Sequence, residues 1–118
     1  MDPIGETLAV VFHINSQDDN SRSITLANVA NLLDDTGDQA QVEVVFNGPA
    51  VVHLLKQSSS ASQIRDLAHR GVLFVACANS LRAQNLSASD LLAEVKIVPA
   101  GVTHLVRRQQ EGWAYIHP

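Results

Sequence analysis

The chain contains one thiol, Cys77, which directly follows the apolar run Val72 to Ala76. The residues after it, Ala78 to Arg82, suit the start of a helix, so the sulfur is predicted to lie where a strand runs into a helix. The first N–H groups of a helix can lower a thiol pKa and hold a thiolate or persulfide anion. The alternative is also strong, because a free cysteine after an apolar strand is often an inert core residue. Position alone therefore leaves both a reactive and a buried structural thiol open.

Six residues near the predicted strand ends are candidates to line a pocket with Cys77. His13 closes the first apolar run, and if the first and third strands are neighbours it can act as proton donor, base or anchor beside the thiol. Asn and Gly at such junctions also cap helices and make turns without any ligand, and a lone histidine is more often structural. The candidates for the pocket or its support are His13, Asn15, Asn47, Gly48, Asn79 and Gly101.

Other kinds of chemistry lack their sequence signatures. A single cysteine allows neither an intrachain disulfide nor a Cys-x-x-Cys oxidoreductase. The sequence has no glycine-rich dinucleotide motif, no P-loop motif and no Gly-x-Ser-x-Gly hydrolase motif. The remaining histidines show no i, i+4 pairing and no zinc-like spacing from Cys77; they are His53, His69, His104 and His117. We therefore predict no metal and no cofactor.

The charge and the N-terminal composition limit which partners and which cellular compartment are expected. The 118 residues include 12 acidic and 8 basic side chains, a net charge of −4, and the basic residues are scattered apart from Arg107 and Arg108. A nucleic acid partner is therefore not expected. The acidic start and the short apolar run Leu8 to Phe12 suit neither a signal peptide nor a membrane span. We expect a cytoplasmic protein with no membrane contact.

Five apolar runs predict the strands of a parallel sheet. Four are rich in β-branched residues and typical of strands covered on both faces; they are Leu8 to Ile14, Val42 to Phe46, Val72 to Ala76 and Val95 to Val98. A weaker run, Trp113 to Ile116, is predicted to be an edge strand whose aromatic side chains pack on the last helix or on another subunit. Because aromatic residues make up only 4% of the chain, Val, Leu, Ile and Ala must fill the core.

Helices are predicted between these runs. Apolar residues at helical spacing between the first two runs indicate a helix that opens near Asp19 to Ser21 and ends at Gly37. Further helical segments are predicted after Pro49, after a Ser60 and Gln63 capping box that leads to Gly71, after a Ser87 and Asp90 capping box, and around Val102 to Val106 with an end at Gly112.

The glycines predict which end of the sheet holds the site. Three of them, Gly37, Gly71 and Gly112, fall where helices should end. Gly48 and Gly101 follow strands, as Cys77 does, and so share the carboxyl edge where open α/β sheets bind ligands. The alternation of strands and helices predicts a single domain over residues 1–118. Its expected fold is a three-layer α/β/α sandwich around a mostly parallel five-stranded sheet.

Four segments stand out together: Val11 to Asn15, Val44 to Pro49, Val72 to Leu81 and Gly101 to Ile116. On these segments the chain resembles the DsrE/DsrF-like family of small sulfur-relay proteins, especially its single-domain branch. The resemblance implies a three-layer α/β/α fold, homo-oligomers such as trimers or hexamers and, in the relay members of the family, a cysteine after the third strand that carries sulfur as a persulfide. Cys77 matches that position. The Arg-Gly pair common after the cysteine of relay members is replaced here by Arg82 and Ala83.

Three functions follow as hypotheses. In the first, Cys77 carries sulfane sulfur as a persulfide between a donor and an acceptor protein, because such exchange needs a thiolate. In the second, the chain is a non-catalytic oligomeric module that binds a small ligand in a pocket at the strand carboxyl ends. In the third, it is an enzyme with Cys77 as nucleophile and His13 as base, which requires the two side chains within hydrogen-bond reach.

Overall fold

The structure, a computed structural model, describes residues 7–118 and alternates strands with helices. The strands are β1 (Ala9–Ile14), β2 (Gln41–Phe46), β3 (Leu73–Cys77), β4 (Val95–Val98) and β5 (Ala114–Ile116). The α-helices are α1 (Asp19–Thr36), α2 (Ala61–His69), α3 (Ala78–Ala83) and α4 (Gly101–Gln110), and two 3-10 helices are η1 (Gly48–Leu54) and η2 (Ala88–Asp90). Each predicted apolar run therefore forms a strand.

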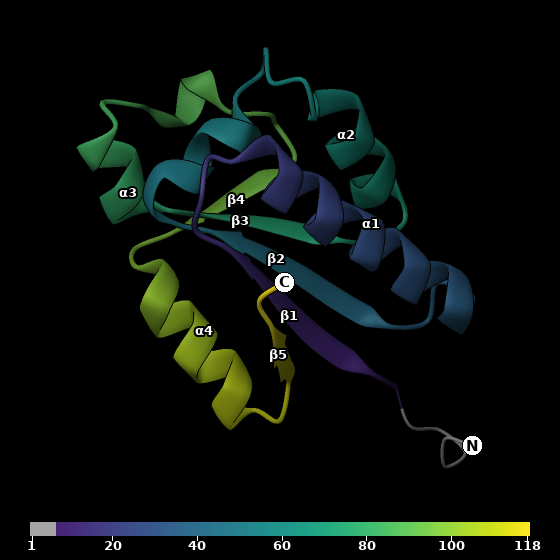
Figure 1. Cartoon of the computed structure of the whole chain (residues 1–118). Coiled ribbons are helices and arrows are strands. Elements are labelled where there is room, and N and C mark those ends of the chain that lie inside the picture. The colour runs from purple at the N-terminus through teal and green to yellow at the C-terminus, as the bar shows by residue number, and fades with distance from the viewer. Residues whose placement is uncertain (1–6) are drawn as a thin grey trace.

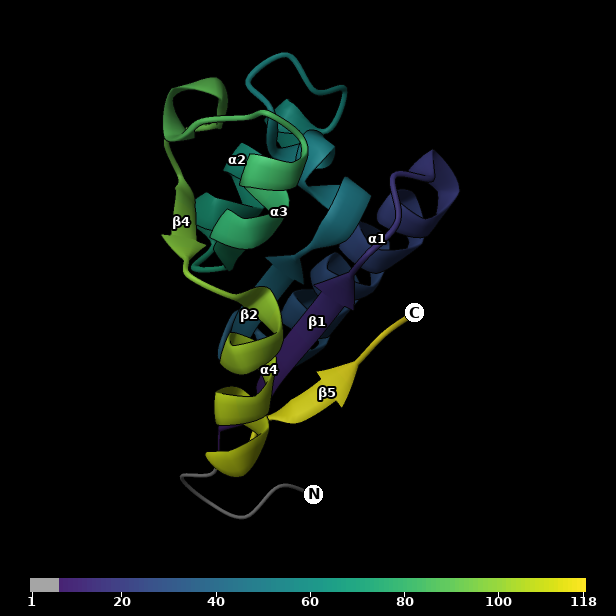
Figure 2. The same ribbon diagram turned by 90° about the vertical axis from the view of Figure 1, so that its left-hand side faces the viewer.

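The five strands are all parallel and lie in the order β4-β3-β2-β1-β5. Parallel neighbours need crossover connections, and the helices between the strands provide them. Helices α1, α2 and α3 lie on one face of the sheet and α4 lies on the other (Figure 1; Figure 2). The predicted three-layer α/β/α fold is confirmed.

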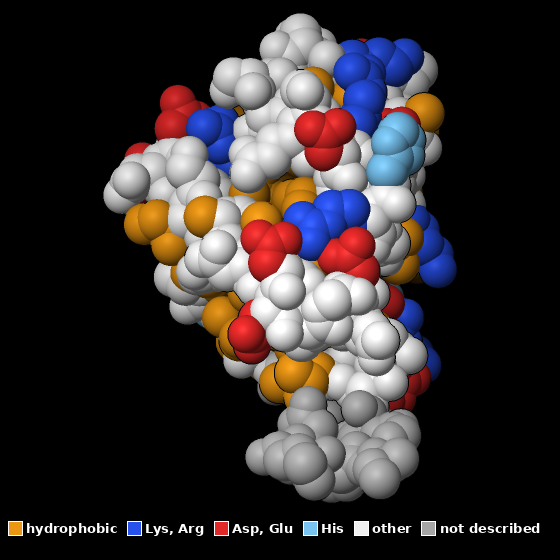
Figure 3. All heavy atoms as spheres, turned by 90° about the vertical axis from the view of Figure 1, so that its right-hand side faces the viewer, with side chains coloured by type: hydrophobic (Ala, Val, Ile, Leu, Met, Phe, Trp, Pro, Cys, Tyr) orange, Lys and Arg blue, Asp and Glu red, His pale blue; other side chains and the backbone are white. Residues whose placement is uncertain are grey.

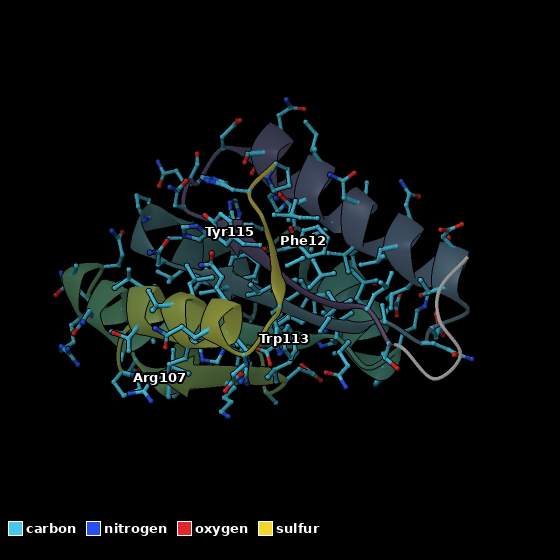
Figure 4. All side chains as sticks on the ribbon, turned by 90° about the horizontal axis from the view of Figure 1, so that it is seen from below. Phe12, Arg107, Trp113 and Tyr115 are labelled. Carbon is cyan, nitrogen blue, oxygen red and sulfur yellow. The ribbon has the colours of Figure 1, made fainter. Side chains whose placement is uncertain are left out.

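The face beneath α1 and α2 holds the larger apolar core. Successive strand residues point to opposite faces, so every second residue of β1, β2 and β3 enters this core. Phe12, Phe46 and Phe74 contribute its largest side chains, each no more than 1% exposed. Phe12 lies on the α1 side of the sheet (Figure 4). Leu26, from α1, and other aliphatic side chains fill the space between the rings, as the low aromatic content requires.

The opposite face is covered by α4 and has a smaller apolar cluster. Its buried members are Val11, Val45, Val75, Val98 and Leu105. The side chains of Glu43 and Cys77 also belong to this face, because they alternate with the residues of the larger core along β2 and β3. The ionisable groups of the central strands are therefore gathered under α4.

The sequence predicted one edge strand of the sheet correctly and the other incorrectly. Trp113 to Ile116 was predicted to be an edge strand, and β5, over Ala114–Ile116, is an edge strand with all three residues exposed. The Val95 to Val98 run was expected to be covered on both faces, but β4 forms the other edge and exposes Lys96 and Ile97. A four-residue run is too short to distinguish a central strand from an edge.

The predicted helix boundaries are confirmed, including the start of α2 at its N-cap Ser60, but one predicted capping box is not. Gly37 adopts φ 61 after α1, and Ser87 and Asp90 form the expected capping box at η2. The capping box predicted at Ser60 is wrong: its side chain makes no capping hydrogen bond, and its hydroxyl is buried without a partner. Ser60 already has helical φ and ψ angles of −92 and −1, so its hydroxyl does not reach the next turn.

Candidate functional site

Cys77 is the last residue of β3 and the N-cap residue of α3. Since β2 and β4 flank β3, the thiol lies near the middle of the carboxyl edge, where the chain turns from the sheet into a helix. The residue is 5% exposed. Its position agrees with the prediction from the sequence, and its low exposure leaves little of the residue accessible to a reactant.

Four hydrogen-bond donors face the sulfur and change its acidity. Burial alone raises the pKa of the Cys77 thiol, but the Ser80 hydroxyl and the backbone N–H groups of Gly101, Ser80 and Asn79 favour the thiolate, and the net pKa is lowered. The neutral side chain makes no regular capping bond to α3, as expected for a weakly accepting thiol. The donors are thus best satisfied when the sulfur carries a negative charge.

Ser80 connects Cys77 to the loop after β2. Its hydroxyl oxygen accepts the Gly48 N–H at 2.7 Å, which leaves the hydroxyl proton free to point at the sulfur. Gly48 has φ +59, in the left-handed region, and this conformation aims its N–H toward Ser80. Sequence reasoning missed Ser80, although a serine three residues after the cysteine, in the first turn of the helix, was the available signal.

Gly101 allows α4 to approach the sheet closely. A Cβ atom on this residue would lie 3.2 Å from the Cys77 Cβ and 3.3 Å from the Asn47 Cβ. As the first residue of α4, Gly101 also presents its N–H to the sulfur. Three predicted site residues, Asn47, Gly48 and Gly101, are therefore brought together around Cys77.

His13 reaches this group only through Asn47. It was predicted to stand beside Cys77 if the first and third strands are neighbours, but β2 lies between β1 and β3. The His13 Nε2 is 2.7 Å from the Asn47 Oδ1, and its Nδ1 is 2.7 Å from the Tyr115 hydroxyl. Because burial lowers the pKa of His13, the ring is neutral near pH 7: Nε2–H donates to Asn47, and Nδ1 accepts from Tyr115.

This arrangement bears on the hypothesis that His13 is a base for Cys77. Both ring nitrogens hydrogen bond to other partners, so neither is directed at the thiol. Tyr115 was expected to pack on the last helix or on another subunit, and its bond to His13 was not foreseen. The geometry supports a bracing role for His13, in which it holds the Asn47 side chain.

Two residues predicted to line the site, Asn79 and Asn15, do not do so with their side chains. The Asn79 side chain is exposed and accepts a hydrogen bond from Arg82, so only its backbone N–H acts on the sulfur. The Asn15 side chain is exposed, while its carbonyl oxygen lies 3.6 Å from where a Gly48 Cβ would be. Both residues shape the backbone of the site, and their amide groups do not line it.

A groove of about 360 Å³ lies next to the site, between the end of β4 and α4. Its lining is Val98, Pro99, Ala100, Thr103, His104 and Arg107. Arg107 lies on the side of α4 that faces away from β5 (Figure 4). These residues differ from those predicted to line a pocket, so the groove is a neighbouring feature of the same sheet edge.

Residues 7–118 show no sign of two other kinds of site. Within that range no group of three or more His, Cys, Asp or Glu side chains is arranged to hold a metal ion. No helix there has the length and apolar character needed to cross a membrane. On the face shown in Figure 3, acidic and basic side chains are interspersed. The prediction about a signal peptide rests partly on residues 1–6, which lie outside the described residues.

Solved structures share this fold over nearly the whole chain. A protein of unknown function, MTH1491 from Methanobacterium thermoautotrophicum, is 41% identical with a TM-score of 0.91, and the match covers 94% of this chain and 99% of that one. The ychN protein from E. coli matches at 15% identity and TM-score 0.76, covering 96% and 100% of the two chains. BT1422 from Bacteroides thetaiotaomicron, also of unknown function, matches at 14% identity and TM-score 0.75, covering 93% and 94%.

The last two matches show the fold alone, whereas the first is close in sequence as well. No significant match was found among curated proteins. The model of the DsrE/DsrF-like family matches residues 8–118, which include every strand and every helix described above. This chain therefore belongs to the DsrE/DsrF-like family.

Proposed function

We propose that the protein carries sulfane sulfur as a persulfide on Cys77. The observation that carries this proposal is the set of donors around the sulfur, which lowers the pKa of the thiol despite its burial. The same donors favour a terminal persulfide anion for the same reason, since they stabilise negative charge on sulfur. Membership of a family that includes sulfur-relay proteins supports the same function.

The chemistry needs no external oxidant or reductant. The Cys77 thiolate attacks the outer sulfur of a donor persulfide, R–S–SH; the new Cys77 S–S bond forms as the donor S–S bond breaks, and R–S⁻ leaves. An acceptor thiolate then attacks the outer sulfur of Cys77–S–SH and restores the Cys77 thiolate. Each step moves one sulfur atom, with its proton, without changing the number of electrons.

The single cysteine determines what happens to the bound sulfur. A second thiol in the same chain could expel it and close a disulfide, but Cys77 is the one cysteine of the sequence. The persulfide must therefore be discharged by a thiol of another molecule. Because Cys77 is only 5% exposed, the bound sulfur is shielded from other reactants until such a partner binds.

We further propose that the chain assembles into a homo-oligomer and works with donor and acceptor proteins in the cytoplasm. Large apolar side chains are exposed on α4 and β5: Val102 at 63%, Val106 at 47%, and Tyr115 and Ile116 at 40% each. Contact between copies is a natural use for such a surface. Light scattering coupled to size exclusion should give a mass of three or six chains, and a monomer over the micromolar range contradicts the assembly.

The experiment that tests the persulfide function is sulfur loading. Reduced protein is incubated with an excess of an organic persulfide, desalted and weighed intact, with Cys77→Ser as the control. The wild type should gain one sulfur atom that a small thiol removes, and the variant should gain none. If the folded wild type gains no sulfur on Cys77 while a cysteine peptide in the same solution does, the carrier function is wrong.

A further inference from the structure

Glu43 is a carboxylate buried in the central strand β2, far from the edge where the thiol lies. It is 5% exposed and sits under α4. One of its oxygens is 2.6 Å from the His104 Nε2, and the other is 2.9 Å from an Arg108 guanidinium nitrogen. The Arg108 Nε adds contacts of 3.1 and 3.0 Å to the two oxygens. Because a buried carboxylate is costly without such partners, both α4 residues are held to it.

The remaining contacts of Arg108 hold the guanidinium in place. It lies 5.0 Å from the centre of the Trp113 ring and is bonded to Glu111 at 2.7 Å. Leu105, between His104 and Arg108 in sequence, is the helix residue of the small apolar cluster. With so little apolar contact under α4, the ionic contacts to Glu43 contribute a large part of what determines where the helix lies on the sheet.

The same helix begins at Gly101, one turn before His104 and about two turns before Arg108. An α-helix transmits displacement along its axis because each turn is bonded to the next. Gly101 fits so closely against Cys77 and Asn47 that a Cβ atom would require its neighbours to give by a few tenths of an ångström, and its N–H is a hydrogen-bond donor to the sulfur. A shift of α4 by a fraction of an ångström at Glu43 therefore changes the distance between this N–H and the thiol.

We propose that Glu43 is a positioning residue for Cys77: through His104 and Arg108 it fixes α4 on β2 and so holds the Gly101 N–H against the sulfur. The groups facing Glu43 are the His104 ring, the Arg108 guanidinium and, beyond Arg108, Glu111. The significance of this arrangement for sulfur transfer rests on the persulfide function proposed above. The test of the positioning role does not depend on the persulfide function, because it measures the acidity of the thiol.

The test compares the pH dependence of Cys77 alkylation in wild type, Glu43→Gln and a matched control. Asp38→Asn is the control, because Asp38 also accepts two bonds from one arginine, Arg70, at 2.6 and 3.1 Å, and does not contact α4. Weakening one of four donors to a charged sulfur should raise the alkylation midpoint of Glu43→Gln by about 0.5 to 1 pH unit. The control should keep the wild-type midpoint.

Two further variants keep the proposal testable if Glu43→Gln does not fold. Arg108→Gln removes one partner from a less buried position and should raise the midpoint in the same direction. Gly101→Ala moves the start of α4 directly and should also raise it. If Gly101→Ala raises the midpoint while folded Glu43→Gln or Arg108→Gln leaves it unchanged, the N–H matters but Glu43 does not position it, and the proposal is wrong. An unchanged midpoint in all of these variants overturns it as well.

Discussion

The two faces of the sheet are built on different physical principles. Beneath α1 and α2, aromatic and aliphatic side chains from alternate strand positions form a continuous apolar core. Beneath α4, the apolar cluster is small, and the same strands present Glu43, His13 and Cys77. Adjacent residues of one strand thus serve different purposes. The first face supplies most of the folding free energy, and the second sets the charge and hydrogen bonding of the thiol.

Truncation of the larger core should have the greatest effect on stability. Phe12 is 1% exposed and lies in that core, so Phe12→Ala should lower the free energy of unfolding by about 3 to 5 kcal/mol. Urea unfolding of wild type and Phe12→Ala measures this loss in the free energy of unfolding. Whatever fraction remains folded should keep the wild-type alkylation midpoint of Cys77; a shifted midpoint would show that the two faces are not independent.

A sharper comparison uses Val44 and Val45, neighbours on β2 that are both 0% exposed but enter different clusters. Val44→Ala should cost about 2 kcal/mol of stability and leave the thiol unchanged. Val45→Ala should cost less because its cluster is smaller. It should also change the alkylation midpoint, since the Val45 Cγ1 lies 3.5 Å from the Gly101 Cβ position. Equal behaviour in both assays would contradict the division between the faces.

Two glycines with the same backbone conformation provide the third comparison. Gly48 has φ +59 beside the site, and Gly37 has φ +61 at the end of α1 with nothing within 4 Å of its Cβ position. Alanine at either position should cost about 1 to 2 kcal/mol through left-handed strain. Only Gly48→Ala should also raise the alkylation midpoint, because it disturbs the N–H that orients Ser80. A matching rise in Gly37→Ala would indicate a general effect of lower stability.

Acid should produce a smaller and more gradual loss of stability that involves both faces. Burial lowers the pKa of His53, whose Nε2–H donates to the Ser16 carbonyl at 3.0 Å, and burial likewise lowers the pKa of His13. The unfolded chain binds protons at these histidines more readily than the folded one, so stability is fully present above about pH 6.5 and falls below it. Urea unfolding at pH 7.5 and 5.5 measures the loss.

Replacement of one histidine tests the cause of that loss. His53→Gln removes one of the two groups and can still donate to Ser16, so its stability should depend less on pH than that of wild type between pH 7.5 and 5.5. The thiol should be unaffected, because His53 packs against Phe46 in the larger core. An unchanged pH dependence would assign the acid sensitivity to other groups.

Local sequence patterns predicted the elements because strand and helix periodicity is a local property. The β-branched runs predicted four of the strands and a weaker run with aromatic residues predicted β5, and glycines after helices and strands indicated which edge holds Cys77. Strand order depends on contacts between distant segments. The prediction that His13 lies beside Cys77 therefore required a neighbour relation that β2 prevents.

Ser80 and Glu43 were not predicted as site residues because their roles, too, depend on contacts between distant segments. In the sequence Ser80 is an ordinary serine in the first turn of a helix, and only the folded structure brings the Gly48 loop next to it. Glu43 is one acidic residue within a valine-rich strand, and its partners His104 and Arg108 are 61 and 65 residues away. An acidic residue in a central strand does signal a buried carboxylate with polar partners, but the sequence does not identify which residues those partners are.

The rate of Cys77 alkylation by iodoacetamide as a function of pH, measured by intact mass, tests most directly whether the α4 face builds a stabilised thiolate. With the pKa of Cys77 lowered by Ser80 and the surrounding N–H groups, the rate should reach half its plateau at a lower pH than that of a cysteine peptide in the same buffers. A midpoint at or above that of the peptide would contradict the account and identify Cys77 as an inert core residue.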